Sequence, residues 1–577
     1  MVWFEKLRLY LIYTTAISLI VLAVAFSVLR AVLPHATGYV KELEQALTEE
    51  TGLPVSIGSM DADMYWLVPR LKLVDVVIRD KDNKRDLLRL DEAFFALAFI
   101  DSILQWAPTV GEISLVGADI YIERHPNNKW PIQGVEFGGV ADSETDTSST
   151  DSSREIIAAI ENTSFSLLDS DIHWQDYQLR HGQLDFIGAN IFIEEFLGDH
   201  SFEINLQLPE SYGESISLIV KTDDDIANFI EADLDIYLQG ESIDLGRWLS
   251  VLNINNLPQV KGVFSGELWL TKQDSMFSDV SFDASVSELK VARENRGSFY
   301  LDGIAGKFEW KKSGDTWFFN SRDIVLTTKN VAWQQLTSIS AIHDKSGLSL
   351  AATYLRSQDL VNIATVFLDE EQLNTLKPYQ INRLEGDFYN LDLLLPAADE
   401  QGIKLTTDFE NLGFVVPGSD ISFRGVDGSL DYVTGRAQLE LLSESVQMDF
   451  GKLFRQPLNA EMVQGLVLFE QKDNDWSIAS DDFYLSNADV EIRSRLALTV
   501  DEAGEIFADI QSDFRNASGA AIHKYYPVSI MSKELLAGLD MAITDGLIDS
   551  GSFVLRRQLK QFPYQDNEGV MEAVFDT

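Results

Sequence analysis

Apolar and polar residues alternate along most of the chain after residue 54, with a period of two. This alternation is typical of half-buried β-strands, because successive side chains in a strand point to opposite faces. Clusters of turn-forming residues, such as Lys-Ser-Gly-Asp at 312–315 and Asp-Glu-Ala-Gly-Glu at 501–505, separate the alternating stretches. Their close spacing leaves little room for crossover helices. We therefore predict a mostly-β fold of antiparallel strands with a few short helices.

The expected number of strands predicts a sheet that must curl. About 500 residues in strands of ~10 with turns of ~5 give roughly 30–35 strands, and one sheet of these would be on the order of 150 Å long. Because sheets twist, a sheet of this size curls, and its apolar face then forms a concave groove. The predicted lining residues are Ile204, Leu206, Leu208, Ile236, Leu238, Leu268 and Leu270. The alternative is that these residues only close the core of a β-sandwich.

The N-terminal segment predicts a membrane anchor. No charged residue occurs in the 21 residues from Leu9 to Leu29, and a helix of that length spans roughly 31 Å, about one hydrocarbon layer. The alternative is a signal peptide cleaved near 23–25, but the apolar run is longer than such peptides have and continues to Arg30. The anchor residues are Leu9, Leu11, Ile12, Ile17, Leu19, Ile20, Val21, Leu22, Phe26 and Leu29.

Two cations before the anchor, Lys6 and Arg8, favour a cytoplasmic N-terminus. The acidic bulk of the chain is then expected in the periplasm of a Gram-negative bacterium, on a single-pass protein of the inner membrane. After the anchor, the spacing of apolar residues predicts a short helix over Tyr39–Glu50. Gly52 and Pro54 are expected to end it.

Four segments follow from these patterns: 1–35, a cytoplasmic tip and anchor; 36–137, a β domain with the short helix; 138–155, an acidic Ser/Thr-rich linker; and 156–577, a repeating β region. The last segment contains a weak internal repeat. Stretches that begin at Gly306 and Gly465 share glycine, tryptophan, aspartate and leucine positions at a constant offset of 159 residues. The repeat predicts an extended array of similar β units.

Charge and composition exclude several classes of function. The chain has 45 Lys and Arg against 91 Asp and Glu, a net charge of −46. Nucleic acids are therefore not expected as partners, because phosphate binding needs clustered cations. Absent cysteine excludes disulfides, thiol nucleophiles and thiolate metal sites. The seven histidines lack metal-ligand spacing, and no phosphate loop or nucleophile elbow occurs. We predict no catalytic, cofactor-binding or metal site, and no enzymatic activity.

Several segments resemble the AsmA-like family. The first are Thr51–Ile57, Tyr65–Trp66 with Pro69–Leu71, Val116–Arg124 and Asn128–Ile132. Others resemble the large members of that family: 243–249, 423–428, 453–458, 525–527, 542–546 and 562–569. The resemblance implies an inner-membrane anchor and a long, curled periplasmic sheet of the kind shared with chorein-type bridge proteins. Because the large members are considerably longer, we expect this chain to be the N-terminal portion of such a protein, truncated at the C-terminus.

The resemblance also implies the function: phospholipid transport from the inner to the outer membrane, which maintains the permeability barrier of the outer membrane. The physics agrees, since exposure of acyl chains to water costs about 0.8 kcal/mol per CH₂. A continuous apolar groove removes that cost while the headgroup stays in water. Expected partners are phospholipids, the inner membrane, and outer-membrane or envelope proteins. One alternative is a scaffold that assembles outer-membrane proteins through exposed strand edges. Another, an envelope glycan enzyme, needs a cleft with perturbed carboxylates.

Overall fold

The computed structural model describes most of the chain, in two units. One comprises Met1–Leu257 and Gly262–Ala284, and the other comprises Pro258–Lys261 and Ser285–Thr577. The predicted linker at 138–155 lies outside the described residues. Within 2–576, the residues not described are 66–67, 80–85, 99–101, 103–108, 126–129, 133–134, 138–162, 178–182, 197, 225–230, 253–257, 294–296, 329–330, 368–382, 398–401, 417, 473–474, 530 and 559–568.

The chain begins with helices. The α1 helix (Val2–Val32) contains one stretch, Tyr10–Val32, that is long and apolar enough to cross a membrane. A 3₁₀ turn (η1, Leu33–Tyr39) joins it to α2 (Val40–Thr51), which confirms the predicted short helix. Gly52 ends α2 in the left-handed conformation (φ 66°), and its N–H donates to Thr48 O at 3.0 Å. Glycine suits this position because it has no Cβ.

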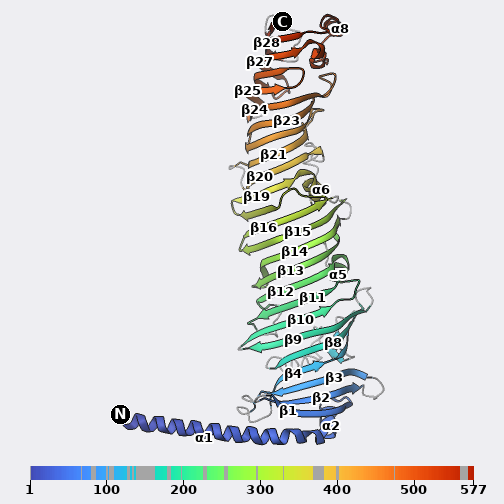
Figure 1. Cartoon of the computed structure of the whole chain (residues 1–577), viewed down its shortest axis with the longest axis vertical. Coiled ribbons are helices and arrows are strands. Elements are labelled where there is room, and N and C mark those ends of the chain that lie inside the picture. The colour runs from blue at the N-terminus through green and yellow to red at the C-terminus, as the bar shows by residue number, and fades with distance from the viewer. Residues whose placement is uncertain are drawn as a thin grey trace. The chain divides into compact units, whose positions relative to one another are not determined.

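The first unit is built on a sheet in which almost every strand runs antiparallel to its neighbours (Figure 1). Its strands are β1 (Val55–Tyr65), β2 (Val68–Arg79), β3 (Asp86–Leu97), β4 (Val110–Val116), β5 (Asp119–Arg124), β6 (Trp130–Ile132), β7 (Val135–Phe137), β8 (Ser164–Asp176), β9 (Leu184–Phe196), β10 (Asp199–Gln207), β11 (Ser215–Thr222), β12 (Leu234–Asp244) and β13 (Gln259–Gln273). The helix α5 (Leu245–Leu252) follows β12.

Two pairings, both made by β8, depart from the predicted antiparallel order. The strand β8 runs parallel to both β4 and β5. A parallel pair needs a long connection that returns the chain to the same end of the sheet, and residues 125–163 separate β5 from β8.

The second unit continues the antiparallel pattern. The strand β14 (Met276–Arg293) is divided between the two units, at Ala284. The later strands are β15 (Gly297–Ser313), β16 (Thr316–Thr328), β17 (Val331–Ala332), β18 (Thr337–Asp344), β19 (Gly347–Arg356), β20 (Glu385–Pro396), β21 (Lys404–Val415), β22 (Ser422–Val433), β23 (Arg436–Asp449), β24 (Leu458–Lys472), β25 (Asp475–Ser486), β26 (Glu491–Val500), β27 (Ile506–Ser518), β28 (Leu547–Gln558) and β29 (Val570–Asp576). The mostly-β fold is therefore confirmed.

The two edges of this second sheet differ. Tight turns at 314–315, 345–346 and 434–435 join strands at one edge, which we call the hairpin edge. The opposite edge carries the helix α6 (Ser357–Phe367) after β19, and the 3₁₀ turn η6 (Gly519–Tyr525) with α8 (Lys533–Ala542) after β27. We call it the helix edge (Figure 1). The same distinction holds in the first unit, where α5 lies at the helix edge and the turns at 198 and 274–275 lie at the hairpin edge.

Many strands contain a bulge at a residue with a positive φ. Examples are Ser242 in β12, Asp323 in β16, Asn390 in β20 and Asn411 in β21. At each of these the pairing register shifts, as between Ser321 and Ile324 and between Phe409 and Leu412. A bulge adds a residue to one strand and bends it. The repeated bulges therefore supply the bends that a long sheet needs in order to curl.

Candidate functional site

The strand register of the first unit places the predicted groove residues on one face of the sheet. Directly opposed residues in an antiparallel pair project to the same side. One row of opposed residues across β8 to β13 is Leu167, Ile191, Ile204, Leu218, Leu238 and Leu268. The row beside it is Phe165, Ile193, Phe202, Val220, Ile236 and Leu270. We call this apolar side the inner face and the opposite side the outer face.

The remaining two predicted residues lie nearer the helix edge. Leu206 opposes Ile216 in the next row, which continues to Gly240 and Gly266. Leu208 lies in a buried core with Ile243, against which Trp248 of α5 packs, and is 9% exposed. The other six predicted residues are half-buried. The register thus brings six predicted residues into rows that solvent reaches, whereas Leu208 belongs to the dry core.

The second unit carries a longer row that the sequence analysis did not single out. Twelve apolar residues oppose one another in sequence from β15 to β27 without a polar interruption. At ~4.8 Å per strand, eleven intervals span about 53 Å. The row is Trp310, Phe319, Ala341, Leu350, Leu393, Leu405, Tyr432, Ala437, Phe469, Ile478, Leu498 and Ala508. We call it the long apolar row. The next opposed residue, on β28, is the buried Arg557.

Burial changes across the inner face from one edge to the other. On β23, Ala437 and Leu439 near the hairpin edge are half-buried. Further along the same face, Leu441 is 8% exposed, Ser443 is 0% exposed and Val446 is 3% exposed. On β23 of the second unit the inner face is therefore closed over a dry core toward the helix edge and open to solvent toward the hairpin edge. A fully closed sandwich would bury the whole row. In the first unit, by contrast, Val220, Ala232 and Leu234 form a buried cluster near the hairpin edge.

The internal repeat is visible in the structure. Trp310 and Phe469 are separated by 159 residues, and both belong to the long apolar row. Trp317 and Trp476, with the same offset, both lie in the second position of the following strand. The strand pairs β15–β16 and β24–β25 are therefore equivalent units, as the repeat predicted.

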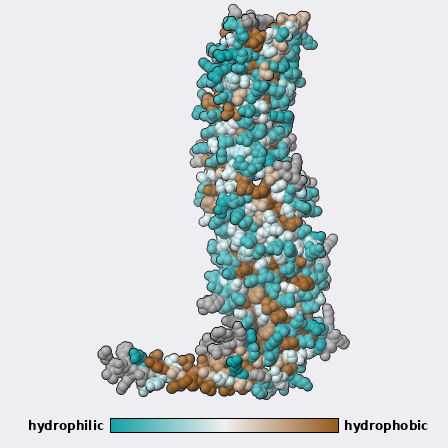
Figure 2. Space-filling view, in the orientation of Figure 1, coloured by the Kyte–Doolittle hydropathy of each residue, from teal (hydrophilic) through white to brown (hydrophobic). Residues whose placement is uncertain are grey.

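The outer face is mainly polar. In the first unit it presents Glu203, Asn205, Asp235 and Glu267, together with one row that contains Ile219, Tyr237 and Trp269. Figure 2 shows a visible surface of mostly hydrophilic colour with smaller apolar areas, in contrast to the apolar α1 helix. On α1, Leu11, Ile12, Ile17, Leu19, Ile20, Val21 and Leu22 are exposed, Leu29 is half-buried and Phe26 is buried, while the Leu9 side chain lies outside the described set.

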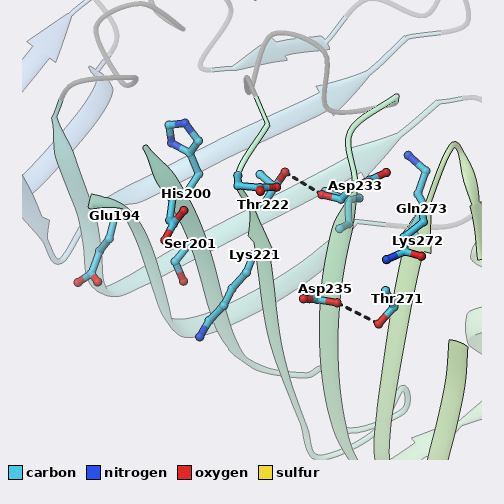
Figure 3. A pocket seen from close by; sticks show the side chains of 13 residues that line it. Glu194, His200, Ser201, Lys221, Thr222, Asp233, Asp235, Thr271, Lys272 and Gln273 are labelled. Carbon is cyan, nitrogen blue, oxygen red and sulfur yellow. Dashed lines mark hydrogen bonds between the residues drawn. The ribbon is translucent and has the colours of Figure 1, made fainter. Parts of the chain in front are cut away.

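A polar hollow of about 610 Å³ lies at the hairpin edge of the first unit, where β9 to β13 begin or end. Figure 3 shows side chains from these strands around it, with the Thr222 hydroxyl donating to Asp233 O at 2.8 Å and the Thr271 hydroxyl donating to Asp235 Oδ1 at 2.9 Å. Five carboxylates line it, against two lysines. Most of its lining residues are therefore charged or polar.

A buried polar cluster fastens α6 to the helix edge. Asp359 at the start of α6 accepts a hydrogen bond from Trp333 Nε1 at 2.8 Å and lies 3.6 Å from Arg356 Nη1. The Tyr354 hydroxyl donates to Asp387 Oδ1 at 2.8 Å. Burial, reinforced by that hydrogen bond, raises the pKa of Tyr354. Every polar group in this cluster has a structural partner, so the cluster holds the helix in place.

The fold and its faces define a class: an N-terminal apolar helix followed by long antiparallel sheets with one apolar, partly open face. The particular family is shown by sequence. A family model described as "YhdP protein" matches residues 1–577, so the chain belongs to the YhdP family. This confirms the resemblance to the large AsmA-like proteins.

The chain is similar to the intermembrane phospholipid transporter YhdP of Escherichia coli strain K12. The two are 20% identical over 597 aligned positions, which cover 98% of this chain and 44% of the relative. The chain thus spans less than half the length of that curated relative. No solved structure matches the chain.

Proposed function

We propose that the chain forms part of a path for phospholipids from the inner to the outer membrane, with the inner face as the surface that holds the acyl chains. The observation that carries this proposal is the long apolar row, together with the partly exposed rows of the first unit. A soluble protein gains nothing from exposed apolar rows, because each CH₂ left in water forgoes about 0.8 kcal/mol. A lipid chain that lies on these rows recovers that free energy.

The open hairpin edge of the second unit supports the same function. An acyl chain on the inner face needs an apolar surface that is shielded from water. The buried residues toward the helix edge supply it. A headgroup needs access to water, which the half-buried rows near the hairpin edge allow. The name of the Escherichia coli relative, an intermembrane phospholipid transporter, agrees with this arrangement.

The proposal includes the placement of the chain. We infer that α1 anchors it in the inner membrane with Lys6 and Arg8 on the cytoplasmic side, so that the strands lie in the periplasm. In this arrangement a lipid leaves the inner membrane near α2 and moves along the inner faces. Because the apolar rows shield the acyl chains from water along the path, a lipid needs no energy source for each step. The direction of lipid movement comes from a gradient or from a partner.

The test is site-specific photo-cross-linking of the full chain in cells labelled with ³²P-phosphate. Benzophenone side chains are introduced at Leu238 and Leu405 on the inner face, and at their neighbours Gln239 and Thr406 on the outer face. We expect radioactive lipid adducts at the two inner positions only. Equal labelling at inner and outer positions contradicts the proposal. Adducts of unfolded outer-membrane proteins in place of lipid would favour the assembly-factor alternative.

A further inference from the structure

We propose that Lys312, Trp317 and His343 form a binding site for the phosphate-bearing headgroup of a membrane lipid at the hairpin edge of the second unit. This inference rests on the proposed function, since it locates the headgroup of the same cargo. It adds a polar binding site to the inner face, which otherwise contacts only acyl chains.

The three side chains lie in one row across three neighbouring strands. Lys312 of β15 opposes Trp317 of β16, and Trp317 opposes His343 of β18. The rings of Trp317 and His343 stack with centroids 5.7 Å apart and an interplanar angle of 6°. This contact requires that both rings project to the same side of the sheet.

The row is adjacent to the start of the long apolar row. Strand side chains two residues apart share a face. Lys312 follows Trp310, Trp317 precedes Phe319, and His343 follows Ala341, so all three lie on the inner face beside the long apolar row. The long apolar row and the polar row that contains Lys312 and His343 are thus neighbours on the same face. A phospholipid has the same succession, with the acyl chains next to the phosphate.

Each side chain suits one part of a headgroup. The Lys312 ammonium supplies a point charge for a phosphate oxygen. The His343 ring supplies an N–H donor from the other side of Trp317. The half-buried indole of Trp317 has an apolar body and a polar N–H, the combination that places tryptophan at membrane–water interfaces. Lys312 and His343 are both exposed, so a ligand reaches them directly.

The carboxylates of this edge form their hydrogen bonds and ion pairs with other groups than Lys312 and His343. Glu309 pairs with Lys311 at 2.7 Å on the outer face. Asp344, also on the outer face, accepts hydrogen bonds from Ser346 at 2.7 Å and 2.5 Å. Asp315 lies in the turn itself. Within the described part of the chain, Lys312 and His343 form no ion pair with any of these carboxylates.

The internal repeat provides a matched comparison within the chain. The equivalent row of the second copy is Gln471, Trp476 and Val500, in which Trp476 opposes both neighbours. The indole is kept, but a neutral amide replaces Lys312 and an aliphatic side chain replaces His343. The Lys312–His343 pair is therefore not required by the strand geometry, which both copies share. We assign it to ligand binding at the first copy.

The test compares two lipids that differ only in the phosphate: dioctanoyl phosphatidic acid and dioctanoylglycerol. Equilibrium binding of each to the purified full chain in amphipol is measured at 0.15 M salt. We expect the chain to bind the phosphate lipid about tenfold more tightly than dioctanoylglycerol. One hydrogen bond to a charged group stabilises a complex by about that factor. The double variant Lys312→Gln, His343→Gln should lose that preference and keep its affinity for dioctanoylglycerol.

Two controls locate the effect. Lys311→Gln removes the same charge from the outer face of the same strand, β15, and should preserve the preference. Gln471→Lys with Val500→His, added to the double variant, should restore it at the second copy. A preference that survives in the double variant overturns the inference.

The remaining outcomes separate the two proposals. Equal affinity of the wild-type chain for both lipids overturns the headgroup site and leaves the acyl-chain face intact. Failure to bind either lipid contradicts both. Displacement of the phosphate lipid by millimolar inorganic phosphate, with dioctanoylglycerol unaffected, would assign the site to soluble phosphate and overturn the lipid assignment.

Discussion

The hydroxyl of Ser443 makes both hydrogen bonds to the backbone of Asp427: it accepts from the Asp427 N–H at 2.8 Å and donates to the Asp427 carbonyl at 2.8 Å. Ser443 is fully buried, and the register between β22 and β23 is interrupted next to this contact, between Arg424 and Gly428. The side chain therefore replaces the strand hydrogen bonds that the bulge removes.

The same arrangement recurs along the second unit. The Ser321 hydroxyl makes both hydrogen bonds to the backbone of Ile339, each at 3.0 Å, beside the bulge at Asp323. At these two bends a small buried hydroxyl therefore satisfies the backbone of the neighbouring strand.

Replacement of Ser443 by alanine should destabilise this bend. Ser443→Ala leaves a buried N–H and carbonyl of Asp427 without their partner, which costs about 1–3 kcal/mol. Hydrogen exchange should report faster exchange of the Asp427 amide, with little change in distant strands. Ser349→Ala, on the exposed outer face of β19, is the matched control. Unchanged protection at Asp427 would contradict the role given to the hydroxyl.

The bulge at Asn411 predicts opposite effects of two substitutions. Its φ of 53° is left-handed, a conformation that costs roughly 1–2 kcal/mol for most L-residues and nothing for glycine. Asn411→Val should therefore lower the thermal unfolding midpoint, whereas Asn411→Gly should leave it nearly unchanged. Equal midpoints for the two variants would show that the bulge relaxes to an ordinary strand.

Acid should release α8 from the neighbouring connection. Arg455 Nη2 lies 2.7 Å from Asp540 Oδ2, and this hydrogen bond lowers the pKa of Asp540. Because the folded pKa lies below the unfolded value of about 3.9, the stabilisation is complete above that value. It is lost as the pH falls through the folded pKa.

The absence of cysteine makes this measurable with a single introduced label. A fluorophore on Lys533→Cys, at the exposed start of α8, should gain mobility between pH 5 and pH 2 by fluorescence anisotropy. Asp540→Asn should show the higher mobility already at pH 7. A label on Ser349→Cys should stay immobile over the range in which α8 is released. Simultaneous release of both labels would indicate general unfolding instead.

Much of the fold follows from the sequence. Alternation in Ile204–Leu208 and in Leu268–Leu270 predicts strands, and Gly52 ends α2 where expected. The helix α8 begins at a serine N-cap, a residue type that favours helix starts, with the Ser532 hydroxyl accepting from Leu535 N at 3.2 Å. These features depend on neighbouring residues, which a sequence displays directly.

The bends and the long apolar row were not predicted, for physical reasons. A bulge at Asp323 or Asn411 resembles any polar outer-face residue, because its positive φ depends on the register of two strands. The sequence shows the alternation around Leu350 and Leu405. Whether these residues lie in one row, however, depends on the pairing register of every strand between them. The same limit explains why Leu208, two residues from Leu206, lies in the core.

The long apolar row predicts that charge within it blocks lipid movement. Leu350 and Leu405 both oppose Leu393, and both are half-buried, so aspartate there can reach water without unfolding the sheet. An acyl chain that crosses the row must then displace that water from a carboxylate, which is strongly unfavourable. In the double variant Leu350→Asp, Leu405→Asp, cross-linking of ³²P-lipid from a benzophenone at Ile478, further along the row, should fall at least tenfold. Labelling at Phe319, before the block, should persist.

The control Ser349→Asp with Thr406→Asp adds the same charges to the exposed outer face and should change the labelling at neither Phe319 nor Ile478. Undiminished labelling at Ile478 in the inner-face variant would mean that lipids do not travel along this row.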